Sequence, residues 1–316
     1  MARKGRAVNR RRASPGGRRP LVALLVVAVL IALAFLLLEY SRKGAPPAKV
    51  ETGVTSAPHL PLPQRAAPVQ PRISSASVPA PKPHATAAPR IPFGSGSGRV
   101  AIIVDDMGSS MQELQALQSI KLPLTYAVIP SLSHAKRVAD SAYAAGAEVM
   151  VHMPMEPEGY PQQRLESIGV LVAMDDKEIA ERVSGYFRSV PHAVGANNHM
   201  GSRFTQHADK MEVVLKVLKE KGVFFVDSRT SPASVGYKTA RAMGLRSGTR
   251  QVFLDNVQDE AVIGKQLAEV AAIARKKGAA IAICHPHPST LRALQAYMPE
   301  LAKSGITFVY ASSLTS

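Results

Sequence analysis

The sequence predicts an α/β protein whose folded part, residues 99–316, is a (β/α) barrel. From Arg99 onward, short apolar runs alternate with amphipathic segments in units of about 25–40 residues, which is typical of a parallel sheet covered by helices. Polar side chains follow the carboxyl ends of six predicted strands, and in (β/α) barrels that end carries the active site. An open doubly wound sheet is the alternative, but its ligands gather at a single switch point, so six contributing strands favour the barrel.

An apolar segment near the N-terminus predicts a membrane anchor at residues 21–40, after a basic tail at residues 1–20. The tail has eight Lys or Arg and no acid, and the run LVALLVVAVLIALAFLLL has neither charge nor proline. About 17–25 apolar residues span a bilayer, and a basic flank keeps its end in the cytoplasm. We therefore expect a single-pass inner-membrane protein whose C-terminal domain is periplasmic. A cleaved signal peptide is the alternative, but Glu39 and Tyr40 stand where a small-residue cleavage site would be.

Residues 41–98 are rich in Pro, Ala and Ser and show neither a helical nor a strand period, which predicts a disordered, extended linker. The formal net charge of +16 is concentrated in the N-terminal parts of the chain. The basic tail carries +8 and the linker +6, so residues 99–316 carry only +3 once Glu39 is counted. A nearly neutral domain argues against binding to nucleic acid.

The predicted strands and helices alternate along the domain. The helix that begins at Asp175 has acidic residues in its first turn, and Ile179, Val183 and Phe187 share one of its faces. Several helices end at a glycine just before the next strand, which is a common helix C-terminus. We expect strands at 100–106, 124–130, 148–155, 193–201, 223–229, 250–256, 279–287 and 306–312, and helices at 111–119, 133–145, 175–188, 209–221, 259–277 and 289–303.

Ionisable or amide side chains follow six predicted strands at the same end. Taken singly, an Asp after a strand is often a helix N-cap, and a lone His there is more often structural than a ligand. Their occurrence together at one end of one sheet favours a functional site. The residues are Asp105 and Asp106, His152 and Glu156, Asn197, Asn198 and His199, Asp227 and Arg229, Asp255 and Asn256, and His285 and His287.

The adjacent acids Asp105 and Asp106 predict a bound divalent metal ion. Two buried carboxylates side by side repel each other, and a cation is the simplest compensation. One Asp and two His form a catalytic zinc-type set that leaves positions open for water and substrate. The second Asp could accept a proton from the attacking water, and a further His could protonate the leaving group. These parts together predict the hydrolysis of an amide or an ester.

Six ordered motifs carry a resemblance to a known family: VDDMG, HMPMEP, NNHMGSRFT, FFVDSRTSP, FLDN and CHPHP. Together they resemble the divergent polysaccharide deacetylases, a branch of the metal-dependent polysaccharide deacetylase superfamily. The resemblance runs from about Val100 to Tyr310, which is essentially the whole predicted domain. It implies a distorted barrel of about seven β/α units, a divalent metal ion, expected to be zinc, and the removal of N- or O-acetyl groups from a glycan substrate.

Carried over residue by residue, the resemblance implies specific roles at the strand ends. Asp105 matches the general base, Asp106 a metal ligand, His152 the first metal-binding His and His285 the general acid. The ordinary deacetylases place a second metal-binding His four residues after the first, where this chain has Glu156. Their Arg-x-Pro-Tyr motif is also missing, and NNHMGS stands in its region.

The third metal ligand is therefore either Glu156 or His199 from the neighbouring predicted strand. We favour His199, because a set of two His and one Asp keeps the charge and the softness that suit the metal. Further residues that could bind the metal or the substrate are Glu156, His287, Asn198, Asp227, Arg229 and Asn256.

Three functions are compatible with these residues. The first is a membrane-anchored, metal-dependent hydrolase that deacetylates an envelope or exported glycan. The second is a catalytically degenerate deacetylase fold that binds a glycan or an envelope protein; Glu156 and the missing Arg-x-Pro-Tyr motif favour it, whereas the retained Asp105–Asp106 pair and His285 oppose it. The third is a (β/α) metal hydrolase of another substrate class. The motifs favour the first.

Overall fold

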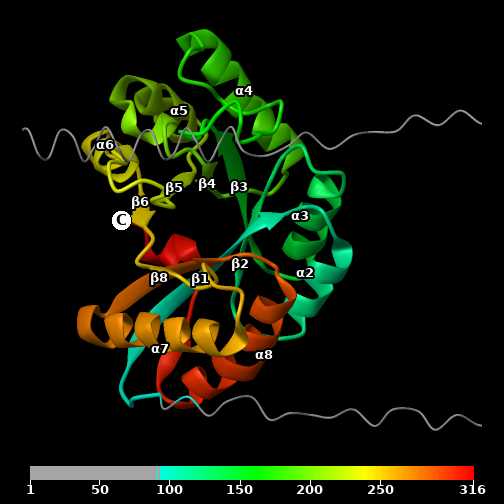
Figure 1. The fold of residues 1–316 in the computed structure, drawn as a ribbon, viewed down its shortest axis with the longest axis vertical. Helices are drawn as coiled ribbons and strands as arrows, with labels where there is room; N and C mark the ends of the chain where they lie inside the picture. The colour runs from blue at the N-terminus through cyan, green and yellow to red at the C-terminus, as the bar shows by residue number, and fades with distance from the viewer. Residues whose placement is uncertain (1–90, 92) are drawn as a thin grey trace, which may run out of the picture. The chain divides into compact units, whose positions relative to one another are not determined.

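The computed structural model describes residues 91 and 93–316 (Figure 1). The predicted basic tail, the membrane anchor and most of the linker lie outside the described residues and stay predictions. Among the helices that are described, none has the length and the hydropathy that a bilayer span needs. Ile91 and Phe93 pack against the domain core, and Arg275 donates a hydrogen bond to the carbonyl of Gly96. The last residues of the predicted linker therefore lie against the folded domain.

Nine parallel strands form one sheet in the described part of the chain. Their order is β6-β5-β4-β3-β2-β1-β8-β7, and β9 pairs with β1. The first strand therefore lies inside the sheet, with β2 to β6 on one side and β8 and β7 on the other. The strands are β1 (Gly98–Met107), β2 (Thr125–Val128), β3 (Glu148–Met155), β4 (Gly195–Met200), β5 (Phe224–Asp227), β6 (Ser247–Thr249), β7 (Val252–Phe253), β8 (Ala279–Cys284) and β9 (Ile306–Phe308).

Helices connect most of the strands and pack on the outside of the curved sheet (Figure 1). Helices α4 and α7 begin one residue later than predicted, because Asp175 and Asp259 are their N-caps: these carboxylates accept hydrogen bonds from the backbone nitrogens of Glu178 and Val262. The helices are α2 (Met111–Gln118), α3 (Ala135–Ala144), α4 (Asp176–Ser189), α5 (Ala208–Glu220), α6 (Gly236–Ala242), α7 (Glu260–Lys277) and α8 (Pro288–Lys303), with the 3₁₀ turns η1 (Phe204–Gln206) and η2 (Ala311–Leu314).

The barrel prediction is confirmed only in part, because the sheet is a curved half-barrel whose end strands, β6 and β7, do not pair with each other. The two strands are joined by Arg250 and Gln251 alone. The backbone nitrogen of Arg250 donates to the carbonyl of Asp227 in β5, and that of Gln251 donates to the carbonyl of Ile281 in β8. The two connecting residues thus form hydrogen bonds with β5 on one side and β8 on the other. Strands β6 and β7, which have three and two residues, do not pair with each other.

Two elements, β6 and α6, lie where the sequence predicts neither a strand nor a helix. Strand β6 has three residues, SGT, without apolar alternation, and α6 has seven residues and begins at Gly236. Conversely, the predicted strand at 250–256 contains only two paired residues, Val252 and Phe253. Elements this short carry almost no periodic signal, so their positions depend on contacts made by distant parts of the chain.

The interior of the half-barrel is apolar at the amino ends of the strands. The turn η2 closes this end: the backbone nitrogen of Ala311 donates to the Thr125 hydroxyl, and that of Ser312 donates to the Glu148 carboxylate. Apart from Thr125 and Glu148, which bond to η2, this end is filled by apolar side chains, and the pocket lies at the carboxyl ends. The buried interior cluster comprises Ala101, Ile103, Ala127, Met150, Phe224, Val226, Ile281, Ile283 and Ala311.

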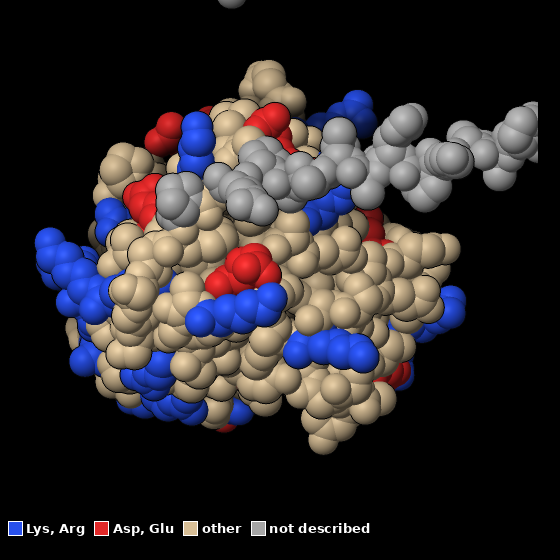
Figure 2. Space-filling model, turned by 90° about the horizontal axis from the view of Figure 1, so that it is seen from below, with Lys and Arg blue, Asp and Glu red and all other residues tan. Residues whose placement is uncertain are grey.

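The surface of the domain carries charges of both signs. Figure 2 shows one face, on which Lys and Arg lie mainly toward the edges, with Asp and Glu among them, while uncharged side chains occupy most of the middle. This distribution agrees with the small net charge of residues 99–316. The expectation that the chain does not bind nucleic acid stays a prediction.

Candidate functional site

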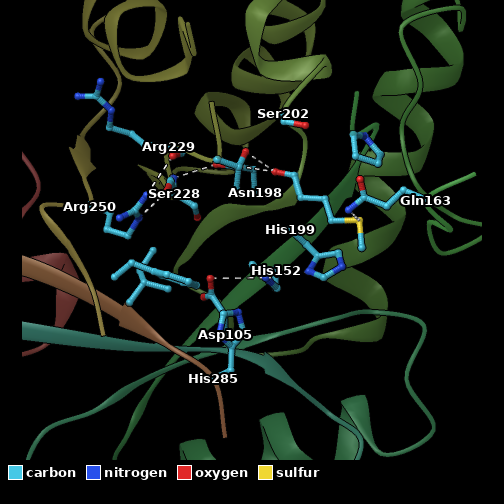
Figure 3. Close-up of a pocket in the computed structure, with 15 residues that line it drawn as sticks. Asp105, His152, Gln163, Asn198, His199, Ser202, Ser228, Arg229, Arg250 and His285 are labelled. Atoms are coloured by element: carbon cyan, nitrogen blue, oxygen red, sulfur yellow. Dashed lines mark hydrogen bonds and ion pairs between the residues drawn. The ribbon is translucent and has the colours of Figure 1, made fainter. Parts of the chain in front are cut away.

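The carboxyl ends of the strands surround a pocket of about 420 Å³ (Figure 3). Because all the strands are parallel, residues that follow different strands meet at one edge of the sheet. The register of β3 and β4 places His152 beside Asn197, and Pro154 beside His199. The predicted residues that line the pocket are Asp105, His152, Asn198, His199, Arg229 and His285.

The end of β1 brings two adjacent carboxylates to the same site. In a regular strand, Asp105 and Asp106 would point to opposite faces of the sheet. The pairing of β1 with β2 shifts register between Val104 and Met107, and Asp106 has a φ of 56°, in the left-handed region. This bulge lets both side chains approach one imidazole. Asp105 Oδ2 lies 3.6 Å and Asp106 Oδ1 3.2 Å from His152 Nε2.

Asp106, His152 and His199 form a group that could hold a metal ion. Asp106 Oδ1 lies 2.9 Å from His199 Nδ1, and the facing ring nitrogens of the two histidines are 3.2 Å apart. Ligand atoms around a tetrahedral zinc, with bonds of about 2.0–2.1 Å, are separated by about 3.3 Å. Asp106 Oδ1 is buried and makes no hydrogen bond of acceptable geometry. An unsatisfied carboxylate oxygen that faces two imidazole nitrogens fits a divalent cation.

Asn197 determines which nitrogen of His152 faces Asp106. Its Oδ1 lies 2.8 Å from His152 Nδ1, and its Nδ2 donates to Asp105 Oδ1 at 2.7 Å and to the Ser228 hydroxyl at 3.2 Å. Because Oδ1 can only accept, His152 Nδ1 carries the proton, and in the neutral ring Nε2 is left with a lone pair. That tautomer is the one a metal at Nε2 requires.

Glu156, the other candidate for the third ligand, is held by different partners. Its Oε1 forms an ion pair with Arg203 at 2.9 Å, and its Oε2 accepts a hydrogen bond from the backbone nitrogen of Val172 at 2.6 Å. Glu156 is buried but does not belong to the group that could hold a metal. The geometry therefore favours His199 as the third ligand.

Glu166 contacts the far side of the His199 ring. Its Oε2 lies 3.6 Å from His199 Nε2, and this oxygen is buried without a hydrogen bond. Imidazoles that bind metals commonly direct their second ring nitrogen to a carboxylate, which orients the ring and raises its basicity. Glu166 lies in a loop between β3 and α4, where the sequence predicts no site residue.

The two adjacent carboxylates have opposite electrostatic environments. Burial raises the pKa of Asp105 above its ordinary value, although the charges of His152 and His285 act against it. Burial also raises the pKa of Asp106, but the close approach and the charge of His152 and His199 outweigh it and hold that pKa well below its usual range. Asp106 therefore stays ionised, as a ligand requires, while Asp105 is the more basic of the two carboxylates.

His285 lies across the pocket and is paired with Asp255. Its Nδ1 is 3.1 Å from Asp255 Oδ1, and the second Asp255 oxygen accepts hydrogen bonds from the His285 backbone nitrogen and the Thr290 hydroxyl. Burial lowers the pKa of His285, but the bond to Asp255 and the charges of the β1 carboxylates outweigh burial and raise it to about 9. His285 Nε2 lies 3.9 Å from Asp106 Oδ2, so a proton donor faces the candidate metal group.

The remaining predicted residues have structural contacts. The Asn198 side chain bonds to Met200, Ser228 and Thr230, and Asp227 accepts bonds from Arg229, Ser234 and Tyr237 in the loop after β5. His287 precedes α8 and forms a second group of possible metal ligands with Asp255 and His285, but both Asp255 oxygens are already bonded to His285 and Thr290. Asn256 is exposed and lines a different hollow.

The pocket also contains residues that the sequence does not identify as candidates. Most of them come from loops or from the short connection between β6 and β7, and the three that lie in strands, Met200, Phe253 and Ile283, are apolar, so no polar strand-end pattern marks them. They are Pro157, Gln163, Met200, Ser202, Ser228, Thr230, Arg250, Phe253 and Ile283.

The curved parallel sheet, with Asp106, His152 and His199 at its carboxyl edge, defines an α/β protein of the deacetylase-fold class that has a candidate metal site. The chain belongs to the divergent polysaccharide deacetylase family, whose model matches residues 102–315. The resemblance predicted from the six motifs is thereby confirmed.

Relatives support the same family and fold. The chain is 36% identical over 218 residues to the uncharacterized protein YibQ of Escherichia coli (strain K12), covering 69% of this chain and 67% of that protein. It is 35% identical over 209 residues to an uncharacterized protein of Haemophilus influenzae, covering 66% and 74%. The crystal structure of an uncharacterized protein from Agrobacterium tumefaciens C58 matches with a TM-score of 0.65 and 27% identity, covering 72% of this chain and 92% of that one.

Metal content distinguishes the two candidates for the third ligand. We expect the full-length chain to bind about one divalent ion, the His199→Ala variant to lose it, and the Glu156→Gln variant to keep it. Gln retains an acceptor for the backbone nitrogen of Val172, so this variant should fold. Elemental analysis after zinc loading, with circular dichroism to check folding, measures the outcome. Loss of metal in Glu156→Gln alongside retention in His199→Ala would reverse the assignment.

Removing the carboxylate of Glu166 should weaken metal binding without abolishing it. The Glu166→Ala variant leaves His199 Nε2 without its buried neighbour, and we expect about a tenfold loss of metal affinity. Competition with a fluorescent zinc chelator measures the affinity. The matched control is Glu158→Ala, which removes a nearby exposed carboxylate that contacts Gln206 instead. Equal affinities for Glu166→Ala and the parent protein would show that Glu166 does not orient His199.

Proposed function

We propose that the protein is a metal-dependent hydrolase that removes acetyl groups from a glycan. The observation that supports it most is the placement of two proton-transfer groups around one candidate metal group. Asp105 lies on one side of the Asp106–His152–His199 group, and the Asp255-paired His285 lies on another. Membership of the family and the open, polar pocket beside these groups support the same reaction class.

The residues of the pocket suit the hydrolysis of an acetyl amide or ester. Asp106, His152 and His199 would hold the divalent ion, which would act as a Lewis acid on the acetyl carbonyl and lower the pKa of a water molecule. Asp105, whose pKa burial raises, would accept the proton of the attacking water. His285, protonated and oriented by Asp255, would donate a proton to the departing amine or alkoxide.

The cellular setting belongs to the same proposal. The apolar segment at residues 21–40 and its basic flank support anchoring in the inner membrane with the N-terminus in the cytoplasm. The hydrolase domain would then be periplasmic, at the end of the Pro- and Ala-rich linker, and its substrate an envelope or exported glycan. The ion would be zinc, in keeping with a set of two His and one Asp.

Replacing the proposed base tests the reaction separately from metal binding. In Asp105→Asn, we expect acetate release to fall by about 10²–10⁴-fold, because the amide cannot accept the proton, while the metal content stays unchanged. The assay measures acetate released from a panel of N- and O-acetylated glycans by the zinc-loaded full-length chain. If the loaded parent protein releases no acetate from any of them, the degenerate, glycan-binding alternative is favoured instead.

The pH profile tests the role of Asp255. Replacing it with Asn removes the negative charge beside His285 and lowers the pKa of this imidazole. His285 then loses its proton at a lower pH, so the alkaline limb of kcat/KM should move to lower pH. The control Thr290→Val removes a hydrogen bond to Asp255 but keeps the charge, and should leave the limb nearly in place. An alkaline limb that does not move in Asp255→Asn would exclude His285 as the acid.

A further inference from the structure

Two arginines form one wall of the pocket. Figure 3 shows Arg229 and Arg250 on one side and His199 and Gln163 on the other. Arg250 comes from the connection between β6 and β7, and its guanidinium lies 5.2 Å from the centre of the Phe253 ring. Arg229 follows β5, has a φ of 49° and extends from the rim. A non-glycine residue in this region is strained, and such residues cluster at functional sites.

Neither guanidinium is neutralised by an ion pair with the described residues. Arg250 donates to two backbone carbonyls, those of Ser228 at 2.6 Å and Arg229 at 3.0 Å, and these contacts orient the group without cancelling its charge. The Arg229 side chain makes no hydrogen bond or ion pair within the described part of the chain. Burial and the charge of Arg229 lower the pKa of Arg250, although the charges of Asp105 and Asp227 act against them. The two cations therefore repel each other.

The positive charge is a property of this wall and not of the whole domain. Residues 99–316 carry a net charge of only +3, and Asp105 is the one acid among the residues that line the pocket. If the proposed metal ion is bound, its two charges balance Asp105 and Asp106. Neither guanidinium then has an ion-pair partner among the described residues: that of Arg250 lies in the wall of the pocket, and that of Arg229 points outward from the rim (Figure 3). A ligand is the simplest source of a pairing anion.

We propose that Arg229 and Arg250 bind an anionic substituent of the glycan, so that the substrate is an acidic acetylated sugar and not a neutral one. This proposal rests on the proposed function, because it places the anion beside the acetyl group that is removed. Guanidinium groups pair with carboxylates and phosphates alike, so the chemistry that is recognised is a negative charge with several oxygen acceptors. A carboxylate or a phosphate group on the glycan could supply this negative charge.

Binding to two matched pairs of sugars tests the proposal. The first pair is the disaccharide of N-acetylglucosamine and N-acetylmuramic acid, with its carboxylate free or as the methyl ester. The second is diacetylchitobiose, with or without a 6-phosphate. The zinc-loaded full-length chain carries Asp105→Asn so that no probe is consumed. We expect the charged member of at least one pair to bind about tenfold or more tightly, with a preference that shrinks as salt is added. The pair with the larger preference identifies the anion.

Substitutions of Arg229 and Arg250 test whether this wall of the pocket causes the preference for the charged sugar. Arg229→Gln and Arg250→Gln should each reduce it severalfold, and Arg250→Lys should retain part of it, because the charge remains but the two carbonyl contacts are not both replaced. The control Arg188→Gln removes an exposed charge from the end of α4 and should leave the preference unchanged. Equal binding of charged and neutral sugars, or a preference that survives both Arg→Gln changes, overturns the proposal.

Acetate release separates this proposal from the proposed function. If the protein with Asp105 intact deacetylates the acid and its ester equally well, the hydrolase stands and the anion site is wrong. If the charged sugar binds selectively but no acetate is released, the anion site stands and the hydrolase is wrong.

Discussion

The placement of two adjacent carboxylates at the end of β1 is the constraint on which the rest of the site depends. Asp105 is 3% exposed, and although the Asp106 side chain is partly exposed, its Oδ1 atom is buried, so neither carboxylate is fully solvated. Water would ordinarily stabilise such charges, and without it the protein must supply donors and cations. The neighbouring strands do so: Asn197 bonds to Asp105, and His152 and His199 face Asp106. The histidines supply positive charge only when protonated, whereas a divalent ion would supply it at any pH at which it binds.

The side-chain amide of Asn197 links the candidate metal ligand His152 to the candidate base Asp105. Asn197 accepts from His152 through its oxygen and donates to Asp105 through its nitrogen. Its side chain is fully buried, so no solvent can replace either contact. A change at Asn197 would therefore alter both the tautomer of His152 and the orientation of Asp105. Such outer contacts are commonly as important to a metal site as the ligands themselves.

The residues at strand ends could be predicted from the sequence, because a parallel sheet brings the ends of its strands together whatever their exact register. Asp105, Asp106, His152, His199 and His285 all follow from that rule and the motifs. The sequence favours His199 over Glu156 on ligand chemistry alone, and only the register that puts His199 beside Pro154 supplies the geometry. The opening of the predicted barrel between β6 and β7 could not be predicted, because these strands are too short to carry a periodic signal. Glu166 lies in a loop and Arg250 at the start of a predicted strand whose polar end is the expected site, so only long-range packing places them at the pocket.

The departure from the ordinary deacetylase pattern at Glu156 has a consequence for the loop above the pocket. The candidate ligand His199 comes from β4, and Glu156 instead bonds to Arg203 and to the backbone of Val172. These contacts hold both ends of the segment that follows β3, and that segment carries Glu166 back to His199 Nε2. The departure from the ordinary deacetylase pattern at Glu156 is therefore compatible with a retained metal site: the carboxylate at that position supports the loop that orients the substitute ligand.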